Sequence, residues 1–214
     1  MSNPFEDPGL VAGYEAWYAG HGARADRQEK RLLAGLLARF PRGGTVLDVG
    51  CGTGHFTRWF VEQGLQAVGL DRSPVMLAEA AKLNGLRYVQ GDALALPFGD
   101  RTFDLVAMVT TLEFVADPRR ALSEAVRVSR SGLILGVLNR LSLLAVRRRR
   151  DARPPWNTAR FFSVGELVQL ARAAAAGRLA NIRWRTTLWP IPGYGSLPLP
   201  WGGFVGMAAS LRVN

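Results

Sequence analysis

Two periodicities alternate along the chain, and the first of them is helical. Over residues 26–40, leucines recur three and four positions apart, so that one face of a helix would be apolar. The Pro-Arg-Gly-Gly run at 41–44 is typical of a helix end. A late helix is expected at 164–176, because Ser163 and Glu166 have the spacing of a capping box.

Short apolar runs alternate with further helical segments between and after these two helices. The stretch 103–110 is apolar almost throughout, as in a strand that is buried on both faces of a sheet. The pattern predicts seven strands, at 45–49, 66–70, 86–90, 103–110, 133–138, 182–189 and 204–213. It predicts intervening helices at about 54–63, 73–83 and 118–128.

This alternation predicts an α/β fold. Strands joined by helices form right-handed crossovers and therefore a mostly parallel sheet, so we expect a doubly wound, seven-stranded sheet with helices on both faces. Residues 139–162 interrupt the alternation of strands and helices and contain four consecutive arginines. We interpret them as a basic lid inserted after the fifth strand. Ligands of such sheets bind at the carboxyl ends of the strands, where the strand order reverses.

The length of 214 residues fits one domain. We expect this domain to comprise an N-terminal arm and helix at 1–44, a ligand-binding core at 45–138, the lid at 139–162 and a C-terminal helix with two strands at 163–214. No basic segment followed by an apolar run opens the chain, and its longest apolar stretch, 133–146, is interrupted and too short to span a bilayer. A cytoplasmic location is expected.

Composition adds two points. The single cysteine, Cys51, excludes an internal disulfide and a multi-cysteine metal or redox site, and we expect no metal. The 27 Lys and Arg residues against 17 Asp and Glu give a net charge of +10. We favour an arginine-rich solvated surface as the explanation, the alternative being an acidic partner: nucleic acid, an anionic membrane, an acidic carrier protein or an anionic substrate.

The residues with the clearest chemistry follow the first predicted strand. Gly50, Gly52 and Gly54 alternate in a turn that leads directly into a helix. Glycines allow positive φ and leave no Cβ between the backbone and a ligand, and the N-terminus of the helix suits a carboxylate. The spacing G-x-G-x-G differs from the G-x-G-x-x-G of dinucleotide-binding proteins, and no lysine follows as it does in a phosphate-binding loop.

Two acidic residues end the next two predicted strands. Asp71 follows the second strand, where its carboxylate can accept hydrogen bonds from both hydroxyls of a ribose; its alternative role is a cap for the helix that begins near Ser73. Asp92 follows the third strand, where it can accept from the exocyclic amine of adenine or, alternatively, form a turn.

In order and spacing, residues 45–138 resemble the class I S-adenosylmethionine (SAM)-dependent methyltransferases, in particular the small-molecule group called methyltransferase-11-like. The resemblance rests on the glycine turn, on Asp71, on the Gly-Asp-Ala run that contains Asp92, and on the loop at 110–118. The segment from Tyr14 to Tyr18 is similar to the N-terminal arm of this group. The resemblance implies a Rossmann-like fold, SAM as cofactor and S-adenosylhomocysteine as product.

The same resemblance implies roles for individual residues. Those implied at the methionine end of SAM are Asp48, which would anchor the turn and the amino group, and Gly50, Cys51, Gly52 and Thr110. Asp71 would hold the ribose. Those implied around the adenine are Arg72 and Met76, which would flank the ring, and Asp92 and Ala93, which would contact its edge. Tyr14 and Tyr18 would close over the sulfonium.

Methyl transfer to a bound acceptor is an in-line displacement at an activated carbon, so the protein mainly has to align the reactants. A base is needed only where the acceptor must lose a proton. The candidates are His55 at a helix start and Glu113 after the fourth strand, with His21 in the arm. His55 is alternatively an ordinary polar residue at a helix start, and Glu113 is equally interpretable as structural.

We expect the acceptor to be a small molecule, either anionic or bound to a carrier. The run from Arg147 to Arg150 would steer such a substrate, touch an anionic membrane, or simply form a solvated helix face. No Asn-Pro-Pro-aromatic run and no Pro-Cys pair is present, which disfavours methylation of DNA bases. An RNA methyltransferase, with nucleic acid as partner, and a non-catalytic SAM-binding protein are the alternatives. The acceptor, the atom methylated and the oligomeric state are not predicted. Aromatic residues expected near the acceptor are Trp156, Phe161, Phe162, Trp189, Tyr194 and Trp201.

Overall fold

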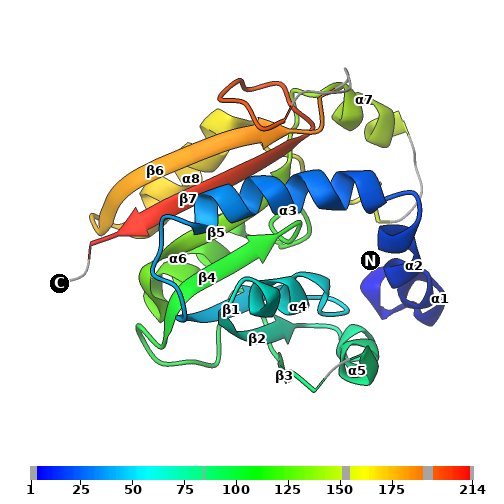
Figure 1. Ribbon diagram of the computed structural model, residues 1–214, viewed down its shortest axis with the longest axis horizontal. Helices are drawn as coiled ribbons and strands as arrows, with labels where there is room; N and C mark the ends of the chain where they lie inside the picture. The colour runs from blue at the N-terminus through cyan, green and yellow to red at the C-terminus, as the bar shows by residue number, and fades with distance from the viewer. Residues whose placement is uncertain (1–3, 84, 151–154, 190–194, 213–214) are drawn as a thin grey trace.

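The computed structural model describes residues 4–83, 85–150, 155–189 and 195–212. Its centre is a seven-stranded sheet with the strand order β3-β2-β1-β4-β5-β7-β6 (Figure 1). The strands are β1 (Thr45–Val49), β2 (Gln66–Asp71), β3 (Arg87–Gln90), β4 (Phe103–Val109), β5 (Ser129–Leu138), β6 (Leu179–Thr187) and β7 (Phe204–Leu211). The predicted doubly wound α/β fold is confirmed.

Six strands of the sheet run in the same direction, and β7 runs in the opposite one. β1 pairs in parallel with β2 on one side and with β4 on the other, and β3 and β5 extend the parallel part outward. β7 lies between β5 and β6 and is antiparallel to both. The chain leaves β1 toward one edge of the sheet and returns to its other side at β4, so the strand order reverses between β1 and β4.

Helices cover both faces of the sheet. They are η1 (Pro4–Glu6), α1 (Pro8–Ala12), α2 (Tyr14–Ala19), α3 (Ala23–Leu37), α4 (His55–Glu62), α5 (Pro74–Leu83), α6 (Pro118–Val128), α7 (Leu143–Arg150) and α8 (Val164–Ala175). Figure 1 shows α3 crossing one face in front of β5 and β7, with α6 and α8 on the far side. No helix among the described residues is long and apolar enough to cross a membrane.

Each face has its own buried cluster. α3 and α4 pack on one face, where Leu33 and Phe60 are fully buried. α6 and α8 pack on the other, where Leu122 and Leu167 are fully buried. α3 approaches its strands closely: a Cβ on Gly206 of β7 would lie 2.0 Å from a methyl carbon of Leu32. A glycine in this strand therefore allows the helix and the sheet to pack together.

Some predicted boundaries were wrong. β5 begins at Ser129, four residues before the predicted start at 133. The first residues of this strand are polar and their pairing with β4 is irregular. The Ser129 hydroxyl holds them by donating to the Gly132 carbonyl and accepting from the Gly132 N–H. β6 likewise begins at Leu179 and ends at Thr187 rather than spanning 182–189. The boundaries could not be predicted because these strand ends lack the alternation of apolar and polar residues by which a strand is recognised in a sequence.

Short helices were also missed. η1, α1 and α2 lie in the predicted N-terminal arm, and α7 lies in the predicted lid. They are too short for a helical apolar period to be visible. The capping box of α8 is as predicted: the Ser163 hydroxyl accepts from the Glu166 N–H, and the Glu166 carboxylate accepts from the Ser163 N–H.

Candidate functional site

A cavity of about 530 Å³ lies at the carboxyl ends of the parallel strands, where the strand order reverses. Of the residues implied to contact the cofactor, those that line it are Tyr14, Gly50, Gly52, Asp71, Arg72, Met76, Asp92, Ala93 and Thr110. They come from α2, from the ends of β1 to β4 and from α5. Asp48, Cys51, Tyr18, His55 and Glu113 are not among its lining residues.

The glycine turn forms one wall of the cavity and is held against β2. The N–H groups of Gly50 and Cys51 both donate to the Leu70 carbonyl, at 2.7 and 3.0 Å. Gly52 has a φ of +54°, and a Cβ there would have only Met76 Sδ at 3.8 Å and Tyr14 Cε1 at 4.0 Å as neighbours. The space that such a Cβ would enter is free, so the backbone at Gly52 forms a cradle on which a ligand group can lie.

The carboxylate of Asp71 stands beside this cradle. Its Oδ2 accepts from the Gly52 N–H and its Oδ1 from the Ser73 N–H, each at 2.8 Å. Burial raises its pKa, against these backbone hydrogen bonds, which lower it. Each carboxylate oxygen has capacity for a further hydrogen bond, so Asp71 both orders the start of α5 and offers acceptors to a ligand in the cavity.

Asp92 has a turn-forming role as well as a place on the cavity. Its Oδ1 accepts from the Leu94 N–H at 2.8 Å, which is the turn interaction that the sequence left open as an alternative. The side chain is exposed, so its second oxygen can accept from a ligand. Ala93, the next residue, is half-buried at the same wall.

Thr110 marks the end of β4 with an unusual backbone conformation. Its φ of +53° is in the left-handed region, and its N–H donates to the Gly136 carbonyl at 2.8 Å. A non-glycine residue held there is strained, and such strain concentrates at functional sites. The neighbouring Thr111 donates its hydroxyl to the Val49 carbonyl at 2.9 Å, which fixes the loop to the end of β1.

The two tyrosines of the arm are placed differently. Tyr14 lines the cavity, and burial raises its pKa to about 12, so its phenol stays protonated and can donate a hydrogen bond. Tyr18 lies behind it and stacks on the ring of His55, with ring centroids 3.6 Å apart. Tyr18 is not among the residues that line the cavity, so its implied contact with the cofactor stays a prediction; through His55 it supports the arm.

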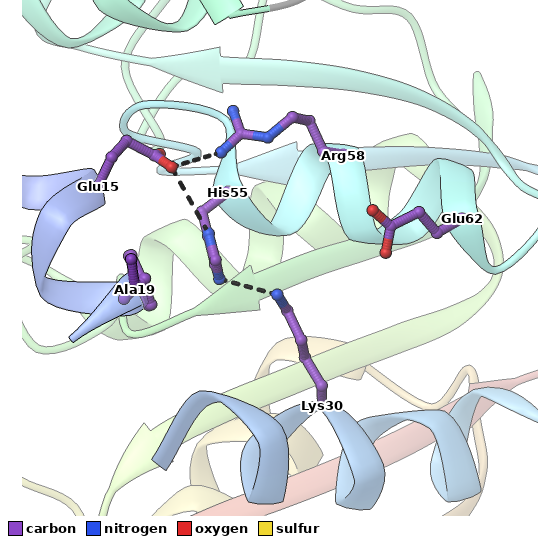
Figure 2. A pocket seen from close by; sticks show the side chains of 7 residues that line it. Glu15, Ala19, Lys30, His55, Arg58 and Glu62 are labelled. Carbon is purple, nitrogen blue, oxygen red and sulfur yellow. Dashed lines mark hydrogen bonds and ion pairs between the residues drawn. The ribbon is translucent and has the colours of Figure 1, made fainter. Parts of the chain in front are cut away.

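His55 lies at the centre of a polar cluster outside the cavity (Figure 2). Its Nε2 is 2.7 Å from Asp26 Oδ1 and 2.9 Å from Lys30 Nζ, and its Nδ1 is 3.9 Å from Glu15 Oε2. Burial lowers the pKa of His55, but the interactions with Asp26 and Glu15 outweigh it, so the net shift is upward. Since His55 does not line the cavity, its role as a base stays a prediction to which this geometry lends no support.

Glu15 connects this cluster to the glycine turn. It accepts from the Thr53 hydroxyl and from Arg58 Nη2, the latter at 2.7 Å. Arg58 Nη1 in turn donates to the Thr53 carbonyl at 2.9 Å. Figure 2 shows Glu15 and Arg58 facing each other beside His55. Since Thr53 lies between Gly52 and Gly54, these contacts hold the arm, and with it Tyr14, against the turn.

Asp48 and Cys51 lie beneath the turn, where both are buried. Asp48 Oδ2 accepts from the Thr57 hydroxyl at 2.7 Å and so holds the first turn of α4. Burial raises the pKa of Asp48 to about 7 and raises that of the Cys51 thiol well above its ordinary value. Asp48 thus joins β1 to the start of α4, whereas its implied roles at the turn and the amino group, and direct contact of Cys51 with a ligand, stay predictions.

Glu113 is a buried carboxyl in the loop after β4. Its Oε1 accepts from the Leu138 N–H at 2.6 Å, and its Oε2 has no hydrogen-bond partner among the described residues. Burial raises its pKa to about 8. Its carbonyl also accepts from the Arg160 N–H at 2.8 Å, so Glu113 joins the end of β5 and the predicted lid to the loop, as in its structural interpretation.

Several cavity residues were missed by the sequence analysis. Phe5 of η1 and Phe114 of the loop after β4 face each other across the cavity mouth with ring centroids 4.9 Å apart, and Thr111 and Thr158 also line the cavity. Phe114 lies in the loop at 110–118, on which the family resemblance partly rests, so the sequence could have indicated Phe114 as a cavity residue. Nothing in the sequence indicated Phe5. It is held in place by the hydrogen bond that its carbonyl accepts from the Ser73 hydroxyl, and these two residues are far apart in sequence.

The aromatic residues expected near an acceptor divide into three groups. Phe161 and Phe162 are buried in the two cores and are unavailable to a ligand. Trp189 and Trp201 line a separate groove, and Trp156 packs between Phe114 and Arg148. Tyr194 lies outside the described residues. No group of three metal-ligating side chains occurs in the described part of the chain.

Comparisons with known proteins agree with this geometry. A family model described as a methyltransferase domain matches residues 47–136. The demethylmenaquinone methyltransferase of Renibacterium salmoninarum is 37% identical over 107 residues, 50% of this chain and 45% of that protein. The malonyl-[acyl-carrier protein] O-methyltransferase of Enterobacter lignolyticus is 33% identical over 135 residues, 62% of this chain and 54% of that protein. The chain spans about half the length of these curated relatives.

A solved structure extends the similarity over nearly the whole chain. The SAM-dependent methyltransferase from Thermotoga maritima matches with a TM-score of 0.76 and 29% sequence identity, over 96% of this chain and 98% of that one. The described cavity fits the cofactor of such proteins, because a free cradle at Gly52, an acceptor at Asp71 and the strained Thr110 converge on it.

Proposed function

Since this chain belongs to the class I SAM-dependent methyltransferases, we propose that it binds SAM in the cavity at the ends of β1 to β4 and transfers the methyl group to a small-molecule acceptor. The observation that carries the proposal is the pairing of the Gly52 cradle with the Asp71 carboxylate on one wall of the cavity. A backbone surface without a Cβ beside a carboxylate with spare acceptor capacity suits the ribose and methionine parts of an adenosyl amino acid.

The proposed contacts follow the position of each residue on the cavity. Asp71 binds the ribose hydroxyls, and Asp92 accepts from the adenine amine while Arg72, Met76 and Ala93 enclose the ring. Gly50, Gly52 and Thr110 contact the methionine end. Tyr14 covers the same end from the arm. Asp48, Cys51 and Tyr18 support these contacts from behind the turn and the arm.

The chemistry then depends mainly on alignment. Bound SAM supplies a methyl group on a positively charged sulfur and leaves as S-adenosylhomocysteine. The chain holds the reactants in line and excludes water, a contribution that can lower a barrier by about 7–11 kcal/mol. Thr110, Thr111 and Tyr14 offer hydroxyl groups at the cavity that can orient the acceptor. Since neither His55 nor Glu113 lines the cavity, we propose that the acceptor loses its proton to water or reacts without losing one.

A small acceptor is supported by the walls and by the relatives. Phe5, Phe114 and Thr158 also line the cavity, whose size of about 530 Å³ suits a small molecule or the end of a carrier-bound chain beside the cofactor. Two of the relatives are named for methylating demethylmenaquinone and a malonyl group on an acyl-carrier protein.

Titration calorimetry with S-adenosylhomocysteine, SAM and NAD tests the proposal. We expect both adenosyl compounds to bind and NAD not to bind. Asp71→Ala should weaken binding at least about tenfold, since it removes a hydrogen-bonded carboxylate. Asp100→Ala, at an exposed residue that pairs with Arg127, is the matched control and should bind normally. A folded protein that binds neither adenosyl compound would overturn the proposal.

A further inference from the structure

Exposed apolar side chains gather on one side of the molecule. Of the eight large hydrophobic side chains exposed among the described residues, six are Trp17, Leu141, Leu143, Val146, Leu199 and Trp201. Three of these six, Trp17, Leu143 and Trp201, line one groove of about 490 Å³. The other three are within two residues of groove-lining positions. We call these six residues the apolar rim.

The charged side chains that line this groove are arginines, as far as the described residues show. The groove lining includes Arg24, Arg147 and Arg148, together with His21, and contains no Asp or Glu. α7 combines both features, because Leu143 and Val146 are 60% and 44% exposed and are followed directly by the arginine run. A surface that exposes apolar side chains among arginines is suited to a partner that is apolar and anionic at once.

The rim is held in place by the fold. Asn139, at the end of β5, donates from Nδ2 to the carbonyls of Pro200 and Gly202, both at 2.7 Å. The Thr186 hydroxyl of β6 donates to the Leu199 carbonyl. These bonds fix the segment that carries Leu199 and Trp201, whose side chains remain 42% and 58% exposed. Their exposure therefore reflects a fixed backbone that presents them outward.

We propose that the apolar rim and the arginines around it bind the surface of an anionic lipid bilayer. Leucine and tryptophan side chains enter the boundary between headgroups and acyl chains, where the indole ring is favoured. Arg24, Arg147 and Arg150 contact lipid phosphates, and arginine binds phosphate oxygens well through its planar fork. A bilayer tolerates apolar tips that project from separate segments, whereas a protein partner would have to match their uneven contour.

The proposed membrane face is a neighbour of the cavity and not part of it. Arg148 of the groove stacks over the ring of Trp156 at 3.7 Å, and Trp156 lies 6.3 Å from the ring of Phe114 at the cavity. This layer separates the two spaces. Membrane binding therefore stands independently of methyl transfer and can be tested without SAM or an acceptor.

Vesicle co-sedimentation is the first test. The full chain is mixed with vesicles of phosphatidylcholine alone and with vesicles that also contain phosphatidylglycerol. We expect binding to the mixed vesicles only, and a decrease of binding as salt is added. Arg147→Glu should weaken this binding at least about fivefold, since each basic residue near an anionic surface contributes measurably. Arg172→Glu, on α8 at the other face of the sheet, carries the same charge change and should bind as the parent protein does.

Insertion is the second test and separates a membrane from other acidic partners. Leu143→Ser with Trp201→Ser should reduce vesicle binding while Val61→Ser with Leu83→Ser, at exposed residues elsewhere, should not. Brominated acyl chains should quench tryptophan emission in the parent protein and quench it less in Trp201→Phe. Equal binding by all variants, or binding without quenching, would overturn the proposal. So would soluble poly-glutamate binding the parent protein as well as the vesicles do, because the face would then fit an acidic polypeptide.

Discussion

Two glycines of the same turn differ in what surrounds them, although both have positive φ. At Gly50, a Cβ would lie 2.3 Å from the Cγ2 of Thr111, a side chain that also holds the loop after β4 to β1. At Gly52, the nearest atom to a Cβ is 3.8 Å away, across the cavity. Gly50 is therefore needed for packing, and Gly52 for access to the backbone.

This difference predicts that two alanine substitutions act mainly on different properties, Gly50→Ala on stability and Gly52→Ala on ligand binding. Gly50→Ala should lower the free energy of unfolding by about 2–4 kcal/mol, because it combines left-handed backbone strain with overpacking. Gly52→Ala should cost about 1–2 kcal/mol from backbone strain alone but should weaken S-adenosylhomocysteine binding at least about tenfold, since its methyl group enters the cavity. Urea unfolding and calorimetry measure the two quantities. If the two variants lost affinity in the same proportion to their loss of stability, the proposed difference between Gly50 and Gly52 would be contradicted.

A second residue-scale prediction concerns Glu113. Its pKa of about 8 in the folded protein exceeds the ordinary value of 4.5, so the folded state holds this proton more tightly than the unfolded state. The stability that it contributes is fully present below about pH 4.5 and is lost as pH rises through about 8.

Glu113→Gln should therefore remove part of the pH dependence of unfolding. The amide can still accept from the Leu138 N–H and cannot ionise, so the variant should gain about 2 kcal/mol relative to the parent protein between about pH 6 and about pH 9. Glu79→Gln, at a carboxyl paired with Lys82, should show no such gain. Parallel pH profiles for the parent and Glu113→Gln would show that burial does not hold the proton there.

At this scale, the sequence identified residues whose chemistry is local. Gly52, Asp71 and Asp92 follow directly from buried strands, so topology alone places them at one edge of the sheet. The left-handed conformation of Thr110 and the contact of Phe5 with Phe114 depend on segments that are distant in sequence. No local pattern reveals such contacts.

At the scale of elements, α2 is joined to the glycine turn through charged side chains. Glu15 accepts from Thr53 and Arg58 of the turn and α4, and His55 links it to Asp26 of α3. Burial raises the pKa of Glu15, but its interactions with His55, Thr53 and Arg58 outweigh burial and lower this pKa to about 2. We therefore expect the arm over the cavity to be held most firmly when Glu15 is ionised and His55 is protonated.

The titrations of Glu15 and His55 define the pH range in which the arm is held most firmly. The contribution of Glu15 is present above its ordinary pKa of 4.5 and is lost as pH falls toward about 2. That of His55, whose pKa is raised, is present below 6.5 and is lost as pH rises through its folded value. We expect affinity for S-adenosylhomocysteine to be highest between these limits and to fall at alkaline pH, as measured by calorimetry across the range.

Glu15→Gln isolates the arm from the rest of the site. Because it removes the charge that joins α2 to the glycine turn and α4, this substitution should weaken S-adenosylhomocysteine binding about three- to tenfold. The decrease in affinity at alkaline pH should become smaller. Amide hydrogen exchange in α2 should become faster. Glu62→Gln, at an exposed carboxyl that lines the same polar pocket, is the control. An unchanged exchange rate in α2 would mean that the arm is held by its apolar contacts alone.

Elements with a clear apolar period were predicted, and those without one were not. β1, β2 and β4 begin within a residue of their predicted starts because buried runs define them. α7 contains the arginine run and so shows no apolar period, and α1 and α2 are both shorter than two turns of helix. His55 was a reasonable candidate base from its place after the turn, yet α4 directs its side chain toward α3 instead of the cavity.

At the scale of the whole molecule, the sheet couples the two cores. Val46 of β1 is buried in the cluster under α3 and α4, whereas Leu47 and Val49 of the same strand are buried in the cluster under α6 and α8. Neither face can unfold without exposing the other side of the same strands. The cavity lies where β1 meets β2 and β4, so a ligand there contacts the strands that both cores share.

Ligand binding should therefore stabilise the whole fold in one step. With S-adenosylhomocysteine at about 100 times its dissociation constant, the gain is about 2.7 kcal/mol, which raises the unfolding temperature of a chain of this size by about 5–10 °C. Far-ultraviolet circular dichroism and tryptophan fluorescence should report one coincident transition with and without ligand. The rise should be smaller for Asp71→Ala at the same ligand concentration. Two separate transitions, with only one moved by the ligand, would mean that the two faces unfold independently and that the shared strands do not couple them.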